Sequence, residues 1–237
     1  MFIATNLARI REEIAEACRR AGRAEAEVAL MAVSKMHPAA AILEAYAAGL
    51  RLFGENRVQE WQEKSLAVGS LDGAKMHLIG PLQSNKTTRA AELFDAIDSV
   101  DSLKIATRLN AAAQTLNKKL PILIEVKLSH EESKHGIAPA ELPTLLAGLA
   151  PLESLVASGL MTVPPWPADI ANAGEEARPY FRELRRLRDA SLPACPTLTQ
   201  LSMGMSNDFP TAIEEGSTCI RIGTALFGRR ASSGEVR

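Results

Sequence analysis

Eight short apolar runs alternate along this chain with longer stretches of helical spacing, and this alternation constrains the fold more than any other feature. The runs predicted as strands are residues 28–34, 50–55, 75–80, 94–100, 120–128, 155–163, 198–204 and 218–224. The stretches predicted as helices are residues 7–16, 38–49, 56–67, 85–93, 102–117, 139–150, 172–190 and 207–215. Strands separated by helices pair in parallel through right-handed crossovers.

Eight such units within 237 residues predict an α/β fold, a single (β/α)8 TIM barrel over residues 1–237. An open doubly wound sheet is the alternative. The helix before the first strand is amphipathic, with Leu7, Ile10, Ile14, Ala17 and Cys18 at helical spacing. Helix C-caps are expected at Gly22, Gly49, Gly148 and Gly216. We expect residues 229–237 to form a frayed tail.

Composition and charge argue against several classes of function. The net charge is -1 and only 4% of residues are aromatic, so no nucleic-acid partner is expected. The arginine-rich stretch at 182–189 mixes acids and leucines with its arginines and reads as a solvated helix face. The three cysteines are widely spaced, which argues against disulfides or a zinc site. The charged N-terminus and the absence of a long apolar stretch predict a cytoplasmic protein without a membrane partner.

Lysine 35 is the first candidate for chemistry. Reactive groups in a TIM barrel lie at the carboxyl ends of the strands. This rule selects Lys35, Glu55, Asn56, Gly80, Ser99, Lys127, Thr162, Ser202 and Gly223. A lysine at an apolar barrel mouth loses hydration, which favours the neutral amine that attacks an aldehyde to form a Schiff base. The alternative is an ordinary lysine whose ammonium reaches water.

Two loops near the end of the chain are candidates for binding phosphate. In "LSMGMSNDFPTAIEEG", Ser206 or Asn207 is predicted to cap a helix that starts near Asp208. In "IRIGTALFG", Gly223 and Thr224 open a short final helical turn. Barrels often bind phosphate in the loops after strands seven and eight, where backbone N–H groups are free. Ordinary capping and a tight turn are the alternative.

Arg221 is a lone charge in an apolar strand. Strand alternation places Cys219, Arg221 and Gly223 on one face. A buried arginine needs a partner. This partner is either an acid on a neighbouring strand or the ring nitrogen or anionic group of a ligand. The four histidines show no metal-ligand spacing, so no metal site is expected, and His77 is interpreted as a core residue.

Seven segments occur in the order of a known family. They are "AVSKMHP", "FGENRVQE", "HLIGPLQSNK", "HEESKHGI", "GLMTV", "LSMGMSNDFPTAIEEGST" and "RIGTALFG". From Val33 to Gly228 the chain resembles the YggS/PROSC-like pyridoxal phosphate homeostasis proteins. The resemblance implies a barrel similar to the N-terminal domain of alanine racemase, with pyridoxal 5'-phosphate held as an aldimine on Lys35.

The resemblance also implies roles for other residues. Ser206, Gly223 and Thr224 match the phosphate-binding positions. Arg221 matches the residue that faces the pyridine nitrogen, and Asn56 matches the asparagine near the ring. Ser202, at the end of the seventh strand, completes the expected cofactor-binding set, and no residue is assigned a catalytic role.

Three positions depart from the family pattern and alter the expected rim of the pocket. Pro81 stands where histidine is usual, so no role for that imidazole carries over. Arg57 replaces a common tyrosine. Lys127 adds a charge near the site.

The expected function is to carry or buffer the cofactor rather than to catalyse a reaction. Pyridoxal phosphate acts as an electron sink best when an acid protonates its ring nitrogen. Arg221 cannot supply that proton because arginine remains cationic. Apo-enzymes that receive the cofactor are the expected protein partners, and the chain is expected to be a monomer or weak dimer.

An amino-acid racemase is the alternative function. Racemisation needs a base on each face of the substrate. In the alanine racemase family one base is a tyrosine from a second domain, and about a dozen residues after strand eight leave no room for such a domain. Tyr46 and Tyr180 lie on predicted helices away from the mouth. A Schiff-base aldolase would use Lys35 but explains neither Arg221 nor the family motifs.

Overall fold

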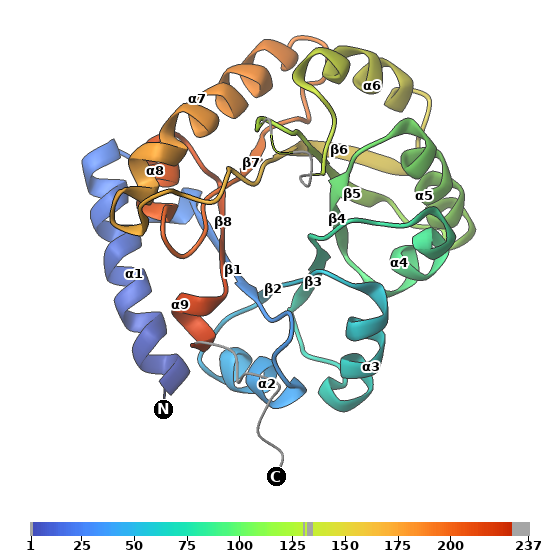
Figure 1. The fold of residues 1–237 in the computed structure, drawn as a ribbon. Helices are drawn as coiled ribbons and strands as arrows, with labels where there is room; N and C mark the ends of the chain where they lie inside the picture. The colour runs from blue at the N-terminus through green and yellow to red at the C-terminus, as the bar shows by residue number, and fades with distance from the viewer. Residues whose placement is uncertain (1, 130, 132–134, 229–237) are drawn as a thin grey trace.

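Eight parallel strands close into a barrel in chain order, and β8 pairs with β1 (Figure 1). The computed structural model describes residues 2–129, 131 and 135–228. The strands are β1 (Ala29–Val33), β2 (Leu52–Glu55), β3 (Lys75–Leu78), β4 (Ala96–Val100), β5 (Leu120–Glu125), β6 (Leu155–Met161), β7 (Gln200–Ser202) and β8 (Cys219–Ile222). The predicted (β/α)8 barrel is confirmed, and the open doubly wound sheet is excluded.

Helices surround the barrel (Figure 1). They are α1 (Phe2–Ala21), α2 (Ala39–Ala47), α3 (Val58–Val68), α4 (Thr87–Leu93), α5 (Leu103–Thr115), α6 (Leu142–Leu149), α7 (Ala173–Ser191), α8 (Phe209–Glu214) and α9 (Thr224–Phe227). None of the described helices is both long and apolar enough to cross a membrane. The predicted tail at 229–237 lies outside the described residues, as do four residues of the "HEESKHGI" segment.

The observed elements differ from the predicted ones mainly at their ends. The seventh strand spans only Gln200–Ser202 rather than 198–204, although the flanking Leu198 and Met203 are fully buried. Apolar runs therefore mark burial, and burial extends beyond the hydrogen-bonded ladder into the loops. Helix α1 begins at Phe2, five residues before the predicted start, because Ile3 belongs to the same buried stripe as Leu7 and Ile10.

One of the four predicted helix caps is wrong. Gly22, Gly49 and Gly216 follow helices with positive φ values, as a C-terminal cap requires. Gly148 instead lies within α6, where a side chain at this position would come within 3.0 Å of Leu103 on α5. This glycine therefore permits two helices to pack closely and does not end one.

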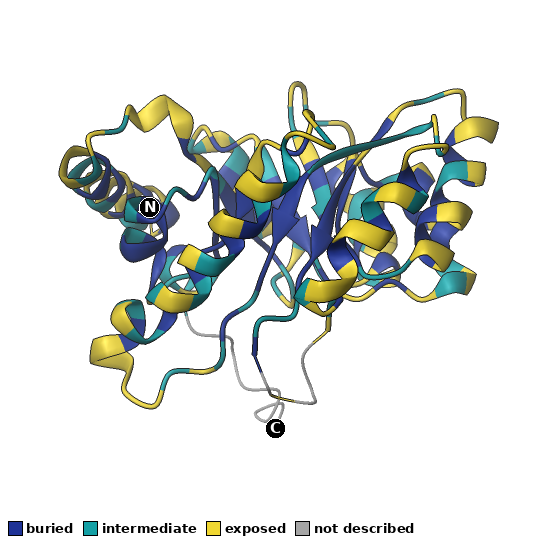
Figure 2. Cartoon of the chain, turned by 90° about the horizontal axis from the view of Figure 1, so that it is seen from above, coloured by how far each residue is buried: buried dark blue, intermediate teal, exposed yellow. Residues whose placement is uncertain are grey.

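The N-terminal helix packs against the C-terminal part of the chain. Helix α1 lies beside α8 and α9 on the outside of the barrel (Figure 1). The side-chain amide of Asn6 donates a hydrogen bond to the carbonyl oxygen of Leu226 at 2.9 Å. Figure 2 shows the consequence for burial: the strands are buried in the centre, and the helices expose their outer faces.

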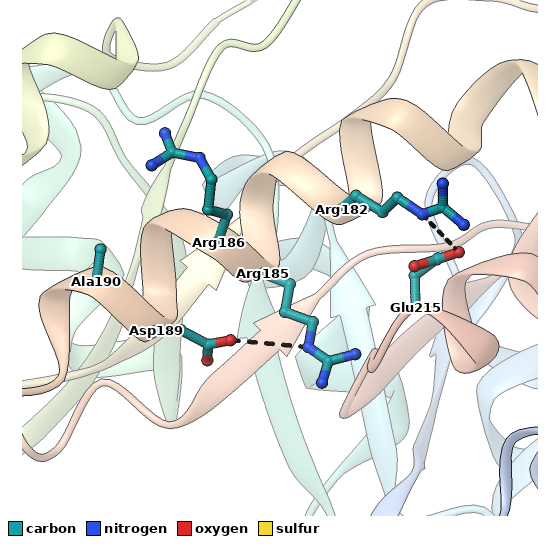
Figure 3. Close-up of a pocket in the computed structure, with 6 residues that line it drawn as sticks. All are labelled: Arg182, Arg185, Arg186, Asp189, Ala190 and Glu215. Carbon is teal, nitrogen blue, oxygen red and sulfur yellow. Dashed lines mark hydrogen bonds and ion pairs between the residues drawn. The ribbon is translucent and has the colours of Figure 1, made fainter.

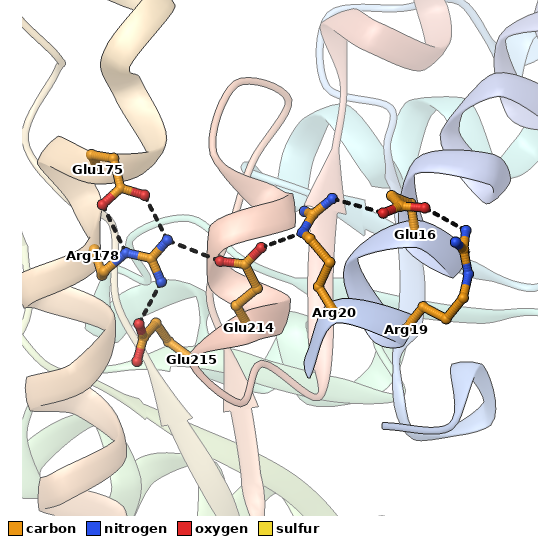
Figure 4. Close-up of polar contacts among 7 residues, drawn as sticks. All are labelled: Glu16, Arg19, Arg20, Glu175, Arg178, Glu214 and Glu215. Atoms are coloured by element: carbon orange, nitrogen blue, oxygen red, sulfur yellow. Dashed lines mark hydrogen bonds and ion pairs between the residues drawn. The ribbon is translucent and has the colours of Figure 1, made fainter. Parts of the chain in front are cut away.

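An ion-pair network ties α1, α8 and α7 together on the surface (Figure 4). Arg178 of α7 donates to Glu175, Glu214 and Glu215, with distances of 2.5–2.9 Å between its nitrogens and their carboxylate oxygens. Glu214 also accepts from Arg20 of α1 at 2.8 Å. The side chain of Arg178 is only 20% exposed, so these interactions are partly shielded from solvent.

The interior of the barrel contains charged groups as well as apolar ones. His77 on β3 donates from Nδ1 to the carboxylate of Asp98 on β4, at 3.1 Å and 3.3 Å from its two oxygens. Strand β4 stands opposite β8 in the ring, and the charge of Asp98 acts on both Cys219 and Arg221 of β8. Burial alone would lower the pKa of His77, but the charge and hydrogen bond of Asp98 outweigh it and raise that pKa.

Replacing Arg178 tests the surface network. Arg178→Ala leaves three neighbouring carboxylates without their shared cation, and we expect it to reduce the free energy of unfolding by about 1 kcal/mol. Arg186→Ala removes an exposed arginine of the same helix that pairs with Glu183 three residues earlier, and it should change stability little. Urea unfolding measures the free energy of unfolding of both variants. The loss for Arg178→Ala should shrink in about 1 M salt, because surface charges are then screened; a loss that salt leaves unchanged would contradict an electrostatic role.

The pair of His77 and Asp98 should make stability depend on pH. Because the folded-state pKa of His77 is raised, its contribution is present at low pH and is lost as the pH rises through that pKa. Asp98→Asn should therefore reduce the free energy of unfolding by roughly 1–2 kcal/mol more near pH 6 than near pH 9. Urea unfolding at the two pH values checks this, with His77→Gln as the variant in which the pH dependence should disappear. Equal losses at both pH values would show that Asp98 acts by packing alone.

Candidate functional site

Lys35 lies just beyond the carboxyl end of β1, whose last residue is Val33. A side chain at Gly54 would come within 2.7 Å of the sulfur of Met31, so these two residues share the barrel interior. Val33 pairs with Gly54, and alternation along β1 places Met31 and Val33 on the face that lines the barrel, two residues before Lys35. Lys35 is half-buried, as expected at a barrel mouth.

Arg221 is held inside the barrel by oxygens of β7 and of the residue that follows β6. Its Nη1 donates to the carbonyl oxygen of Ser202 at 2.6 Å and to the hydroxyl of Ser202 at 2.8 Å. Its Nη2 donates to the carbonyl oxygen of Thr162 at 2.8 Å. No carboxylate among the described residues is in ion-pair contact with this guanidinium, so the alternative of a structural ion pair with an acid on a neighbouring strand is not observed.

Carboxylates nevertheless surround Arg221 at longer range. Burial lowers the pKa of Arg221, and the charges of Asp98, Glu125 and Asp208 oppose this effect. The arginine is 4% exposed and stays cationic, because its ordinary pKa is far above neutrality. The barrel therefore encloses a fixed positive charge beneath its mouth.

The loops after β7 and β8 meet at one place. The hydroxyl of Ser206 accepts a hydrogen bond from the backbone N–H of Ala225 at 3.2 Å. This contact brings Ser206 beside Gly223 and Thr224 at the start of α9. A side chain at Gly223 would lie 3.4 Å from the carbonyl oxygen of Val33, so this place adjoins the end of β1.

The predicted capping of α8 by Ser206 or Asn207 is wrong. The N-cap of α8 is Asp208, and no side chain caps this helix. The carboxylate of Asp208 instead turns back to accept from the backbone N–H of Met205 at 2.5 Å. Ser206 is thereby free to reach the start of the other helix, which sequence spacing cannot reveal.

The remaining strand-end residues serve structural roles in the described structure. A side chain at Gly80 would lie 2.3 Å from the carbonyl oxygen of Asn56, so this glycine permits the loops after β2 and β3 to approach closely. The hydroxyl of Ser99 donates to the carbonyl oxygen of Gly80 at 2.6 Å, and the hydroxyl of Thr162 donates to the carbonyl oxygen of Val126 at 2.8 Å. Asn56 is half-buried at the same end of the barrel.

Glu55 does not line the barrel, although strand position made it a candidate. Its Oε1 accepts from the hydroxyl of Ser34 at 2.7 Å and from Nζ of Lys64 on α3 at 2.9 Å. It is therefore buried between the strands and a helix. Sequence reasoning missed Glu60 and Lys64, whose only signal is a four-residue spacing on a helix that follows the second strand.

The residues that depart from the family pattern lie toward the surface. Arg57 and Pro81 are exposed, and Lys127 is half-buried. All three follow strands at the carboxyl end of the barrel. They can alter the rim without displacing Lys35 or Arg221.

A groove of about 470 Å³ lies elsewhere, on the outer face of α7 (Figure 3). Its arginines are paired with acids: Arg182 with Glu215 at 3.1 Å, and Arg185 with Asp189 at 3.7 Å. These ion pairs agree with the prediction that residues 182–189 form a solvated helix face. The groove holds neither the lysine nor the converging loops, so we place the candidate site at the barrel mouth. No group of His, Cys, Asp and Glu among the described residues could hold a metal ion.

The mouth brings together three kinds of group. Lys35 offers an amine that can react with an aldehyde. Arg221 supplies a buried positive charge. Ser206, Gly223 and Thr224 supply hydroxyls and backbone N–H groups that suit a phosphate. This donor set fits a phosphorylated aldehyde with a polar ring.

The sequence is similar to proteins named for the phosphorylated aldehyde pyridoxal phosphate, which is a ligand of the kind that this donor set fits. The model of the family "Alanine racemase, N-terminal domain" matches residues 5–231. The pyridoxal phosphate homeostasis protein of Escherichia coli K12 is 44% identical over 230 residues, which cover 96% of this chain and 97% of that protein. The protein of the same name from Pseudomonas aeruginosa is 46% identical over 228 residues, covering 96% of each.

Solved structures show the same relationship. PipY of Synechococcus elongatus, solved with pyridoxal phosphate bound, has a TM-score of 0.83 and 42% identity over 95% of this chain and 100% of that one. An alanine racemase of Clostridium difficile has a TM-score of 0.73 at 15% identity, covering 98% of this chain but 58% of that one, and shares the fold. With these matches along nearly its whole length, the chain belongs to the family of pyridoxal phosphate homeostasis proteins, which has the fold of the alanine racemase N-terminal domain.

Proposed function

We propose that this protein binds pyridoxal phosphate and carries or buffers it in the cytoplasm, with Lys35 as the residue that holds the cofactor covalently. The observation that carries the proposal is the convergence of Lys35, Arg221 and the loop residues Ser206, Gly223 and Thr224 at one end of the barrel. The names of the relatives and the cofactor bound in PipY support it. The whole chain, residues 1–237, acts in this proposal as one cofactor-binding domain.

Each residue of the site has a separate task in this proposal. Ser206, Gly223 and Thr224 bind the phosphate, and Lys35 holds the aldehyde carbon. Arg221 faces the ring nitrogen, Asn56 lies near the ring, and Ser202 orients the guanidinium through its carbonyl and hydroxyl oxygens. When bound, pyridoxal phosphate supplies a conjugated ring that can withdraw electrons from an attached amino acid.

The fixed charge of Arg221 argues for binding without efficient catalysis. A cation beside the ring nitrogen opposes protonation of that nitrogen and weakens the ring as an electron sink. Decarboxylation and transamination are thereby disfavoured. Racemisation tolerates such an arginine but needs a second base, and both tyrosines of the sequence lie on outer helices. The hydroxyl of Tyr46 donates to the carbonyl oxygen of Asp72 at 2.9 Å.

In this proposal the site stores the cofactor until it is delivered to another protein. Free pyridoxal phosphate is a reactive aldehyde, and a covalent but reversible bond to one amine keeps it from other amines. Apo-enzymes that need the cofactor are the proposed recipients. A monomer or weak dimer suffices for this role, because every proposed contact comes from one chain.

Borohydride trapping tests the covalent role of Lys35. The protein is incubated with pyridoxal phosphate, reduced and mapped by peptide mass, and the label is expected on Lys35. Lys35→Ala should fold but lose the label and the associated absorption band, because a half-buried lysine at a strand end contributes little packing. Lys127→Ala, a half-buried lysine of the same rim, should retain both.

Two outcomes would count against the proposed function. A label found mainly on Lys127, or on Lys134 outside the described residues, would contradict the role of Lys35. Sustained interconversion of L- and D-amino acids that Lys35→Ala abolishes would favour the racemase.

Substitutions in the two loops test phosphate binding. Each of Ser206→Ala and Thr224→Val removes a hydroxyl expected to bind the phosphate dianion, and should weaken pyridoxal phosphate binding by about 10- to 150-fold. Binding of unphosphorylated pyridoxal should change little, because it makes none of these contacts. Absorption titrations measure both ligands, with Thr107→Val on the outer face of α5 as the control. Equal losses for both ligands would mean that the hydroxyls support the fold instead.

A further inference from the structure

A polar cluster lies between the end of β1 and helix α3. The ammonium of Lys64 donates to the carbonyl oxygen of Ser34 at 2.9 Å, to Oε1 of Glu55 at 2.9 Å and to Oε1 of Glu60 at 2.6 Å. The hydroxyl of Ser34 donates to the same oxygen of Glu55 at 2.7 Å. The residue that precedes Lys35 is thus held by its carbonyl and by its side chain.

The residue that follows Lys35 is held by the same cluster. The backbone N–H of Met36 donates to Oε1 of Glu60 at 2.5 Å. Met36 has a φ of 63°, in the left-handed region that side chains other than glycine rarely adopt. Such a conformation costs free energy and persists only where the surroundings enforce it. The hydrogen bond to Glu60 and that from the N–H of His37 to the carbonyl oxygen of Ser34 hold the segment in this conformation.

Stability alone does not explain why this cluster is buried. Glu55 is fully buried, and the side chain of Lys64 is 12% exposed. The second carboxylate oxygen of Glu55 has no hydrogen-bond partner within residues 2–129, 131 and 135–228. Burial raises the pKa of Glu55 against the opposing effect of Lys64 and Ser34, so the site disfavours the ionised form of this carboxyl group. Buried ion pairs are weak sources of stability, and an orphaned oxygen makes this one weaker.

We propose that Ser34, Glu55, Glu60 and Lys64 form a positioning cluster that fixes the backbone on both sides of Lys35. The consequence is that the amine of Lys35 leaves the end of β1 in one direction, toward the barrel mouth. None of the four residues touches the ligand in this scheme. The inference rests on the proposed function, in which Lys35 holds the cofactor, and adds the residues that orient it.

The scheme separates two contributions to cofactor binding. Covalent capture needs the amine of Lys35 in the correct place, whereas the phosphate and ring contacts come from other strands. A loosened segment around Lys35 should therefore weaken the covalent contribution alone. A ligand without the aldehyde, 4'-deoxypyridoxine 5'-phosphate, reports the other contacts.

The experiment compares two glutamates of α3. Glu60→Ala removes the acceptor of the Met36 N–H, and Glu63→Ala removes an exposed glutamate one turn further along. We expect Glu60→Ala to weaken pyridoxal phosphate binding by about 10- to 100-fold, because a misplaced reactive group loses effective concentration. Affinity for 4'-deoxypyridoxine 5'-phosphate should stay at the wild-type value. Glu63→Ala should match the wild type with both ligands.

Two further variants sharpen the comparison. Glu60→Gln keeps an oxygen that can accept from Met36, so it should recover most of the affinity that Glu60→Ala loses. Ser34→Ala removes one contact to Glu55 with little change in volume, and should show a smaller loss in the same direction. Ser34→Ala also keeps the inference testable if Glu60→Ala folds poorly.

The outcomes distinguish the inference from the function on which it rests. Borohydride labelling of Lys35 in the wild type and in Glu63→Ala supports the function, and its absence from both would overturn function and inference together. With labelling present, equal losses of both ligands in Glu60→Ala would show that the cluster only docks α3. Unchanged pyridoxal phosphate binding in Glu60→Ala would overturn the inference alone.

Discussion

Closure of the barrel is the constraint on which the site depends. Strands β1 and β8 are almost two hundred residues apart in the chain, yet they pair in register from Ala29 with Cys219 to Ala32 with Ile222. This pairing places Met31 beside Arg221 and brings the loops after β7 and β8 next to the segment that carries Lys35. A sheet left open between these strands would separate Lys35 from the residues proposed to bind phosphate by the width of the sheet. The site is therefore a property of the closed ring.

The polar groups inside the ring add a second condition. Most of the barrel is packed with apolar side chains, but Arg221, Asp98 and His77 carry charge or can acquire it. Carbonyl oxygens of β7 and of the segment after β6 fix the guanidinium, so its position follows from the backbone and not from a mobile acid. A backbone-held cation keeps its place when ligands exchange. This suits a protein that must bind and release the same cofactor repeatedly.

Sequence periodicity revealed the barrel because each strand–helix unit buries its own apolar face, and the strand-end rule then selected Lys35. The lone charge of Arg221 was visible for the same reason, since a buried cation interrupts an apolar run. Contacts between distant segments were not visible. Ser206 meets the N–H of Ala225 rather than its own helix, and the four-residue spacing of Glu60 and Lys64 looks like any exposed helical pair. Packing decides which face of α3 turns toward the end of β1. Packing also decides the close approach of α5 and α6 at Gly148.

The packing of α1 against α8 and α9 also bears on how the chain is made. Helix α1 precedes α8 and α9 in the chain, so its apolar stripe of Ile3, Leu7, Ile10 and Ile14 is synthesised before the helices that pack against α1. Until α8 and α9 are synthesised, this stripe lacks those native partners, and contacts of such long sequence separation form slowly. The nascent chain therefore exposes part of the apolar face of α1 until α8 and α9 have been synthesised.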